Sequence, residues 1–425
     1  MKKTGKNLAA IILAAGKGER MKSSLPKVLH PICGRPMLAY ILDLVEELNI
    51  KNTVAVLGYG YERVKPHLKP WIKVVIQRRL LGSADAVKVG LSALKNFSGT
   101  ILVLYADNPL LKKETIKKLI QYHQENEPAV TLLTGKVKDP SGYGRILRDA
   151  NFNICGIIEE KDADEFQKGI KEINTGIACF DKDSLIQALK KVRPDNRKKE
   201  YYLTDTVGIL YKKGLLIDNV RLLDIKEALG VNSRVDLAKA NRIIQTRINE
   251  DLMKQGVTII EPDSTFVSYG TRIGKDTIIY PFTVIESGVK IGKRCHIGPF
   301  AHIRSGTRLK DDVVVGNFLE VSRSRISSGT IAKHFGYIGD SEIGRFVNIG
   351  AGCVTANFDG KTKNKTIIKD GAFIGSDTVL IAPVSIGRCA RTGAGAVVVK
   401  NQNIGDGETV VGIPAKSIKI KTSYK

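Results

Sequence analysis

The sequence predicts an α/β fold, in which a Rossmann-like domain with a mostly parallel sheet precedes a left-handed parallel β-helix of hexapeptide repeats. Two patterns support this prediction. About the first 230 residues alternate short β-branched runs with amphipathic stretches, which is typical of a sheet flanked by helices. Beyond Pro262 an aliphatic residue recurs at every sixth position, which is typical of a β-helix. We therefore expect a Rossmann-like domain at 1–231, a linker helix at 232–256 and the β-helix at 257–425.

The α/β part is predicted from short β-branched runs that lie between amphipathic stretches. We expect five strands, at 9–13, 53–57, 73–76, 100–105 and 129–134. A helix is expected over 233–255, because Leu237, Ala240, Ile244, Ile248 and Leu252 fall on one helical face. Asn232 or Ser233 can cap its start.

The β-helix is predicted from an unbroken six-residue step. Its members are Ile273, Ile279, Ile285, Ile291, Ile297, Ile303, Leu309, Val315 and Val321, and the step resumes at Ile368, Ile374, Leu380 and Ile386. Each short strand would place one side chain in the core of a triangular prism before the chain turns a corner. The polar segment 357–365, NFDGKTKNK, interrupts the repeat, and we expect it to form a loop with a binding role.

Composition limits the partners that the chain can have. Lysine and arginine outnumber aspartate and glutamate by 24, which favours polyanions such as phosphates, coenzyme A, nucleic acid or an anionic membrane surface. Aromatic residues are not interleaved with basic clusters, so we do not expect a nucleic-acid partner. The six cysteines show neither C-x-x-C spacing nor clustering with histidines, which favours reduced thiols.

The amino terminus has a basic start and an apolar run, but no small-residue cleavage site follows, so we do not expect a secretory signal. No apolar stretch approaches the roughly 18 residues that a membrane helix requires. We expect a cytoplasmic protein without a transmembrane segment.

A glycine-containing loop follows the first predicted strand directly, at 13–21, with the sequence LAAGKGERM. Gly16 and Gly18 would let backbone N–H groups approach phosphate oxygens, and Lys17, Arg20 and Lys27 could neutralise their charge. The loop lacks the third glycine of a dinucleotide fingerprint and the G-K-[ST] ending of a Walker A loop. By itself it is weak evidence for nucleotide binding.

Continued through SLPKVL at 24–29, the segment resembles the signature of sugar-nucleotide pyrophosphorylases. The resemblance extends across nearly the whole chain and is closest to the bacterial bifunctional N-acetylglucosamine-1-phosphate uridyltransferase/glucosamine-1-phosphate acetyltransferase family. The other segments that carry it are 77–83, 104–110, 142–146, 156–159, 172–176, 201–205 and 230–232.

For the first half, the resemblance implies a nucleotidyltransferase that forms UDP-N-acetylglucosamine from UTP and N-acetylglucosamine 1-phosphate. Asp107 and Asn232 would bind Mg²⁺, and Arg20 and Lys27 would act on the triphosphate as catalytic cations. The resemblance implies further substrate contacts in three groups and from Asn232. The loop would contribute Leu13, Ala14, Gly16 and Lys17. Gln77, Gly82 and Ser83 would contact the uracil ring, and Gly144, Glu159 and Asn174 would contact the sugar.

For the second half, the resemblance implies acetyl transfer from acetyl-CoA to glucosamine 1-phosphate. His334 would be the catalytic base and Glu320 a supporting carboxylate. The sugar phosphate would contact Arg304, Tyr337, Asn348 and Lys363, and acetyl-CoA would contact Ala351, Asn357, Phe358, Ser376 and Ala394. The family also implies a homotrimer with acetyl sites between subunits.

Several positions depart from the pattern of the family. In the first half these are Glu19, Leu80, Ala106 and Glu160, which stand where Thr, Gln, Gly and His are usual. In the second half Ser322 replaces a lysine expected at the sugar phosphate, Phe358 replaces a tyrosine, and Gly412 lies where an arginine is expected. Arg323 could replace the missing lysine, but in a strand it would point to the opposite face.

These departures leave two alternatives open. One is a monofunctional nucleotidyltransferase, acting on this or another sugar or nucleotide, whose β-helix is a scaffold. The other is a non-catalytic sensor of nucleotide sugars.

Overall fold

The computed structural model describes residues 7–418 of the 425-residue chain. The chain divides into two compact units, at 1–243 and 244–425. Within the described residues, none of the helices combines the length and the apolar character needed to cross a bilayer. None of the six cysteines, all of which lie in this range, takes part in a disulfide.

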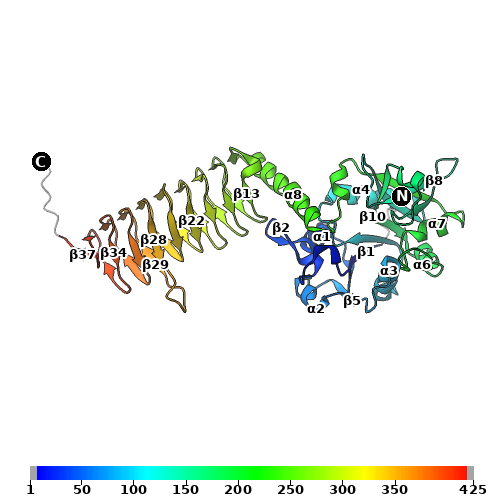
Figure 1. The fold of residues 1–425 in the computed structure, drawn as a ribbon, viewed down its shortest axis with the longest axis horizontal. Coiled ribbons are helices and arrows are strands. Elements are labelled where there is room, and N and C mark those ends of the chain that lie inside the picture. The colour runs from blue at the N-terminus through cyan, green and yellow to red at the C-terminus, as the bar shows by residue number, and fades with distance from the viewer. Residues whose placement is uncertain (1–6, 419–425) are drawn as a thin grey trace, which may run out of the picture. The chain divides into compact units, whose positions relative to one another are not determined.

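The first unit is built on one mixed sheet, which lies among helices in Figure 1. The strand order is β11-β7-β10-β6-β1-β4-β5. The bounds are β1 Leu8–Ala14, β4 Asn52–Leu57, β5 Lys73–Ile76, β6 Thr100–Tyr105, β7 Val130–Lys136, β10 Glu172–Asp181 and β11 Ile217–Arg221. β10 runs antiparallel to both neighbours, whereas the other pairs are parallel. All five strands expected from the sequence form. The aliphatic residues of β1, β4, β6 and β7 are buried, whereas those of the edge strand β5 are only half-buried.

Helices cover the sheet, and small hairpins extend it. The longer helices are α1 Met37–Glu47, α3 Ser83–Leu91, α4 Lys113–Asn126, α6 Lys182–Leu189 and α7 Asp205–Tyr211. Short helical turns lie at α2 Tyr61–Val64 and α5 Glu165–Lys168. The hairpin β8 Gly144–Arg148 and β9 Ile154–Ile158 joins the sheet through β10, and a small pair forms from β2 Pro31–Ile32 and β3 Arg35–Pro36. One core cluster joins β1, β4 and β6 to α3 and α6.

The expected linker helix is α8, Arg234–Lys254. Of the two residues that could cap it, Ser233 does so, because its hydroxyl accepts a hydrogen bond from the Asp236 amide at 3.2 Å. The Asp236 carboxylate in turn accepts from the Ser233 amide at 2.9 Å, which completes a reciprocal cap. Ala240, Ile244 and Leu252 are buried, as the predicted apolar face requires.

The second unit is a parallel β-helix whose short strands stack into three sheets. Sheet I contains β12 Thr258–Ile259, β15 Ile278–Ile279, β18 His296–Ile297, β21 Val314–Val315, β24 Ile331–Ala332, β27 Asn348–Ile349, β30 Phe373–Ile374, β33 Arg391–Thr392, β36 Thr409–Val411 and, antiparallel, β37 Lys416–Ser417. Sheet II contains β13 Phe266–Val267, β16 Val284–Ile285, β19 His302–Ile303, β22 Leu319–Ser322, β25 Gly336–Gly339, β28 Cys353–Ala356, β31 Val379–Ile381 and β34 Val397–Val398. Sheet III contains β14 Arg272–Ile273, β17 Lys290–Ile291, β20 Arg308–Leu309, β23 Arg325–Ile326, β26 Ser341–Ile343, β29 Thr366–Ile368, β32 Val384–Ile386 and β35 Asn403–Ile404.

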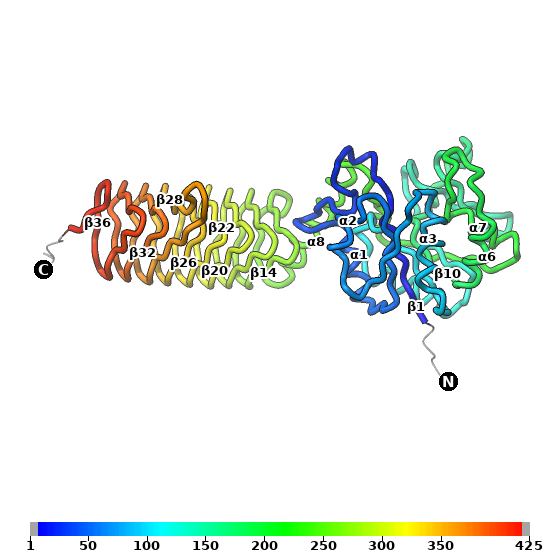
Figure 2. Tube along the Cα trace, turned by 90° about the horizontal axis from the view of Figure 1, so that it is seen from below, coloured from blue at the N-terminus to red at the C-terminus, as the bar shows by residue number. Residues whose placement is uncertain are grey.

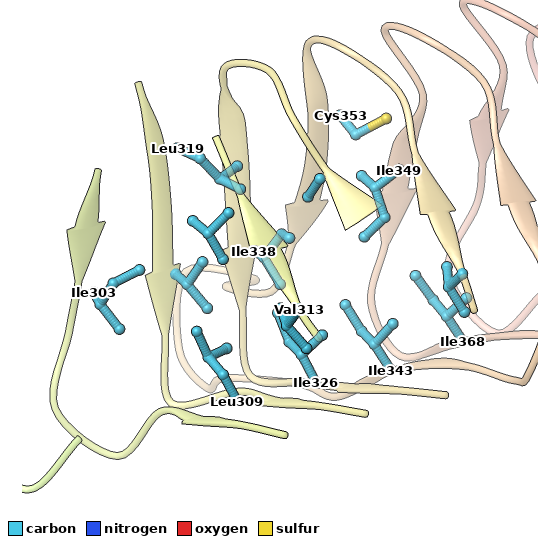
Figure 3. Packing of buried hydrophobic residues seen from close by; sticks show 14 of the residues in the cluster. Ile303, Leu309, Val313, Leu319, Ile326, Ile338, Ile343, Ile349, Cys353 and Ile368 are labelled. Atoms are coloured by element: carbon cyan, nitrogen blue, oxygen red, sulfur yellow. The ribbon is translucent and has the colours of Figure 1, made fainter. Parts of the chain in front are cut away.

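Every residue of the predicted six-residue step is buried in one continuous core. Figure 3 shows how Ile303 of β19, Leu309 of β20 and Ile326 of β23 point into this interior. The step shortens to five residues between Val321 and Ile326 and again between Ile338 and Ile343, which is why the first run ends at Val321. The shortened corners contain Arg323 and Asp340, both with φ near +48°.

The segment 357–365 leaves the prism between β28 and β29, as expected from its polar composition. The Asp359 carboxylate organises this loop. It accepts hydrogen bonds from the amides of Lys361 at 3.0 Å and Thr362 at 2.8 Å and from the Asn364 side chain at 2.9 Å. These bonds hold the pKa of Asp359 well below its usual range.

Candidate functional sites

The glycine-containing loop leaves the carboxyl end of β1, at the edge of the sheet where parallel α/β folds bind ligands. Leu13 and Ala14 are buried in the strand, and Gly16 and Lys17 are exposed in the loop. Gly18 has φ +66°, and a Cβ atom at this position would lie 2.6 Å from Lys27 Cβ. The glycine is therefore needed both for the backbone conformation and for the close approach of Lys27.

Three residues far apart in the chain meet beside this loop. The Lys27 ammonium donates a hydrogen bond to the Asp107 carboxylate and another to Asn232 Oδ1 at 3.1 Å. Asp107 lies two residues after the end of β6, and its carbonyl accepts from the Val231 amide at 2.8 Å, which holds Asn232 close. The structure thus brings together the two predicted metal ligands and one predicted catalytic cation.

The donor set at this point fits Mg²⁺. One carboxylate and one amide oxygen already converge on a cation, the Lys27 ammonium. No cluster of three or more His, Cys, Asp or Glu side chains suited to a metal occurs among residues 7–418. A metal held by Asp107 and Asn232 would therefore take its other ligands from water and substrate phosphates, as Mg²⁺ commonly does.

Arg20 lies in the turn that follows the loop. Its side chain is exposed and forms no ion pair with any residue that the structure describes. The neighbouring Glu19, one of the departures from the family, pairs with Lys17 at 3.1 Å. Arg20 is therefore available to a phosphate, whereas Lys17 already has an acidic partner.

The residues expected at the uracil ring form one connected segment. Gln77 is buried, and its amide donates to the Gly82 carbonyl at 3.2 Å and to the Asp85 carboxylate at 2.7 Å. Gly82 has φ +121°, and a Cβ atom there would lie 2.4 Å from the Tyr201 carbonyl oxygen. The Ser83 hydroxyl accepts from the Leu203 amide at 2.9 Å, so the segment is fixed to the chain before α7.

The residues expected at the sugar also converge. Gly144 of β8 and Asn174 of β10 are direct partners in the sheet. A Cβ atom on Gly144 would lie 3.5 Å from Glu159 Oε2, so this carboxylate is adjacent. Glu159 accepts from the Thr204 hydroxyl at 3.0 Å, and burial raises the pKa of its carboxyl group.

Beneath these residues lies a buried ion pair that the sequence did not reveal. The Arg145 side chain is 1% exposed, and its guanidinium contacts the Glu160 carboxylate at 2.5 Å and the Tyr143 carbonyl. Glu160 follows Glu159, the carboxylate expected at the sugar, and Tyr143 precedes Gly144. The departure at position 160 places a negative charge against this buried arginine, which is the one signal in the sequence that could have suggested the pair.

A second acid near the sugar residues was also not predicted. Asp205 begins α7, and its pKa is raised to about 6 by burial and by the charges of Glu159 and Asp162. Asp205 lies in the segment 201–205, which resembles the family, but the sequence did not indicate which residues surround its side chain.

In the β-helix, Glu320 and Tyr337 are neighbours on the outer surface of sheet II. The Arg304 guanidinium donates to Glu320 Oε1 at 2.9 Å. His334 lies exposed in the corner just before β25, and Asn348 lies half-buried on β27 of sheet I. The corner between sheets I and II therefore carries the predicted base, and the predicted sugar-phosphate contacts Tyr337 and Asn348 lie on the two sheets that meet there.

Arg323 does not lie in a strand, so the expectation that it points to the opposite face is wrong. It follows β22 in a left-handed corner conformation. Its guanidinium contacts both carboxylate oxygens of Asp340 at 2.7 Å and donates to the Ser322 hydroxyl at 2.8 Å. The Asn357 amide donates to the same Asp340 and to the Tyr337 hydroxyl at 3.4 Å. Arg323 is thus connected to two predicted site residues.

Three residues expected at acetyl-CoA occupy equivalent corners of successive coils. Ala351, Ser376 and Ala394 each come two residues after the buried strand residue of sheet I. Hydrogen bonds from the Asp377 amide to the Ala351 carbonyl and from the Gly395 amide to the Ser376 carbonyl, at 2.7 and 2.8 Å, stack these corners. The result is a line of small side chains along one edge of the prism.

The remaining acetyl-CoA residues and Lys363 lie in the loop that leaves the prism. Asn357 is buried at its start, Phe358 is 59% exposed, and Phe358 forms an isolated antiparallel bridge with Lys363.

Comparison with known proteins supports the predicted domain type of each half of the chain. Residues 10–169 match the model of the MobA-like NTP transferase domain, and residues 270–305 match that of the bacterial transferase hexapeptide repeat. The protein named bifunctional protein GlmU from Shouchella clausii is 44% identical over 422 residues, covering 92% of this chain and 93% of that protein. Proteins of the same name from Geobacillus thermodenitrificans and Pelotomaculum thermopropionicum are 43% and 45% identical, with coverage of 92% and 89% of this chain and 92% and 90% of theirs.

The chain belongs to the GlmU family. The predicted family and fold class are confirmed, and so is the expectation of a bifunctional uridyltransferase/acetyltransferase. In this member of the GlmU family, the first group of site residues lies wholly in the first unit and the second group wholly in the second unit.

Proposed function

We propose that the first domain joins UTP to N-acetylglucosamine 1-phosphate, releasing pyrophosphate, and that the β-helix acetylates glucosamine 1-phosphate with acetyl-CoA. The observation that carries the proposal is the convergence of Lys27, Asp107 and Asn232 at the carboxyl ends of β1 and β6. Such a cluster can hold a cation and a triphosphate together. The domains would correspond to 1–231 and 257–425, with the linker helix between them.

In the first reaction the protein has to bring two anions together. Arg20 and Lys27 would bind the triphosphate and stabilise negative charge on the leaving pyrophosphate. Mg²⁺, held by Asp107 and Asn232, would neutralise phosphate charge when bound. Lys27 has to exchange its contact with Asp107 for a phosphate contact as the substrates enter, which the length and flexibility of a lysine side chain allow.

Recognition of the base and the sugar would come from fixed backbone segments. Gln77, Gly82 and Ser83 are held against the chain before α7 and would face the uracil ring. Gly144 offers a backbone group, Glu159 a carboxylate and Asn174 an amide to the hydroxyl and acetamido groups of the sugar.

In the second reaction His334 would take a proton from the amine of glucosamine 1-phosphate as it attacks the thioester carbon of acetyl-CoA. The C–S bond then breaks, and free coenzyme A leaves. Glu320 would support the site through its ion pair with Arg304. Tyr337, Asn348 and Lys363 would contact the sugar phosphate, while Ala351, Asn357, Phe358, Ser376 and Ala394 would line the groove for acetyl-CoA.

The outer surface of the prism supports a homotrimer. Apolar residues point outward on sheets I and II, where Val284 is 38% and Phe373 is 48% exposed. Phe282, Phe300 and Phe318 stack at the corner between these sheets, with centroid distances of 4.8 and 4.9 Å. Contact with further copies of the chain would cover this apolar surface, which adjoins the predicted acetyl site. A cytoplasmic location fits both sets of substrates.

The proposal is tested by separating the two activities. Asp107→Asn should reduce pyrophosphate release from UTP and N-acetylglucosamine 1-phosphate by at least about a hundredfold, with release of coenzyme A unchanged. His334→Ala should do the reverse. Asp183→Asn on α6 and His296→Ala on β18, both at exposed positions, are the matched controls and should change neither rate. Parallel loss of both activities in either site variant would contradict the assignment.

A further inference from the structure

A row of positive charges runs along the outer surface of sheet III. Arg272, Lys290, Arg308 and Arg325 occupy the same position in four successive coils and are direct partners in the parallel register. All four side chains are exposed. Figure 2 labels β14 and β20, which contain Arg272 and Arg308, and the later strand β26 of the same sheet. We call these four residues the basic ladder.

The basic ladder is not neutralised within the described part of the chain. None of its four members forms an ion pair or a side-chain hydrogen bond there. The next residue of the row is Glu342, the register partner of Arg325, and its carboxylate forms an ion pair with Lys365 at 2.9 Å. Lys365 and, to a smaller extent, Arg325 hold the pKa of Glu342 below its usual range. At the corner that follows sheet III, Asp312 pairs with Arg294 at 2.7 Å. These two acids therefore have their closest partners outside the basic ladder.

Such an arrangement is unfavourable in the isolated protein. Neighbouring strands lie about 4.8 Å apart, so each cation has a like charge directly beside it. Like charges at opposed positions of a sheet destabilise it. An external anion that spans several coils would relieve this repulsion.

The proposed enzymatic sites do not use this surface. Glu320 and Tyr337 lie on sheet II and Asn348 lies on sheet I, which also carry the outward apolar residues. The first residue of each strand from β14 to β23 on sheet III is instead Arg or Lys. The row also accounts for part of the excess of 67 basic over 43 acidic residues.

We propose that the basic ladder binds the anionic phospholipid headgroups of a membrane surface, so that the protein associates peripherally with a bilayer. A rigid sheet with four aligned cations can contact several headgroups at once. No aromatic side chain points outward from β14, β17, β20 or β23, so the surface offers no stacking platform for nucleic-acid bases. The inference goes beyond the proposed function and does not depend on either reaction.

The test is co-sedimentation of the full chain with vesicles. The probes are vesicles of phosphatidylglycerol mixed with phosphatidylcholine and vesicles of phosphatidylcholine alone. The protein should bind only the anionic vesicles and should dissociate as NaCl is raised. A variant with Arg272→Gln, Lys290→Gln, Arg308→Gln and Arg325→Gln should bind at least about a hundredfold more weakly, since each cation near an anionic surface contributes roughly fivefold.

A control variant has the same change in net charge. It carries Lys117→Gln, Lys118→Gln, Lys190→Gln and Lys191→Gln, at exposed positions of the first unit. It should bind anionic vesicles nearly as well as the wild type, and both variants should keep both enzymatic activities, which shows that they fold.

Three results would overturn the proposal. They are equal binding to both kinds of vesicle, equal loss of binding in the two variants, and ladder-dependent binding of single-stranded polyuridylate that is tighter than binding to anionic vesicles. The last would identify the surface as a nucleic-acid site.

Discussion

The ion pair between Arg145 and Glu160, beside the residues proposed to bind the sugar, yields a prediction about stability and substrate binding. Glu160→Ala removes the only carboxylate that the Arg145 guanidinium contacts among the described residues. Arg145 is 1% exposed and cannot turn to solvent without displacing its neighbours. The variant therefore leaves a buried positive charge that keeps only bonds to backbone carbonyls.

The magnitude follows from how deeply each partner is buried. Breaking a fully buried ion pair costs about 3 to 5 kcal/mol of unfolding free energy. The Glu160 side chain is 33% exposed, so water can replace part of its interaction, and we expect a loss of about 2 to 3 kcal/mol. For a domain of this size that loss lowers the melting temperature by about 5 to 10 °C.

Differential scanning calorimetry of the full chain measures the change in melting temperature, in the transition of the first domain. Steady-state kinetics measures the change in substrate binding. Because Glu160 adjoins Glu159 and Arg145 holds the Tyr143 carbonyl, we expect KM for the sugar phosphate to rise roughly tenfold while KM for UTP stays within about twofold.

Glu172→Ala is the matched control. It breaks the bidentate pair between Glu172 and Arg148, which lies on the same hairpin as Arg145. The Arg148 side chain is 30% exposed and the Glu172 side chain 25% exposed. A pair that water can reach contributes at most about 1 kcal/mol, so this variant should melt within about 4 °C of the wild type. If Glu160→Ala melts no lower than Glu172→Ala, or changes the two KM values equally, the reasoning from burial is refuted.

Three further predictions concern other parts of the two sites. The pKa of Asp205 is raised to about 6, so the folded protein binds an extra proton between about pH 4 and 6, and its unfolding free energy should fall as pH rises through that window. Urea denaturation of Asp205→Asn should lack this pH-dependent component. If the unfolding free energies of the variant and the wild type change in parallel with pH, this prediction is contradicted. Gly82→Ala should raise KM for UTP at least about tenfold, because φ is +121° and the new methyl group would lie 2.4 Å from the Tyr201 carbonyl oxygen. Arg323→Ala should raise KM for glucosamine 1-phosphate roughly tenfold by leaving Asp340 without its bidentate partner, and an unchanged KM would show that Arg323 has no role in that site.

The regular parts of the fold could be predicted because their signals are local and repeated. Each six-residue step contributes one buried aliphatic side chain, and the stacking of successive coils in one core reinforces the same register. The five predicted strands form for a similar reason, since continuous apolar runs have to be buried on both faces of a sheet. The helix α8 could be predicted because its apolar residues recur with helical periodicity and a capping serine precedes it.

The corners of the β-helix were harder to predict. The five-residue steps at Arg323 and Asp340 change the direction of both side chains and bring them together across successive coils. In the sequence they are separated by 17 positions, and the two shortened steps do not show that these side chains contact each other.

The order of residues was enough to predict the two repeating patterns of the chain, the order of its domains and the residue types available for phosphate, sugar and acyl chemistry. Which of these residues contact one another became clear from the folded chain. Lys27, Asp107 and Asn232 meet because β1 and β6 are neighbours in the sheet and end at the same edge. The Arg145–Glu160 pair exists because a hairpin folds a charged residue inward, where the low polarity of the interior requires a counterion. Charge pairing and burial depend on distances through space, and these become defined only when the whole chain packs.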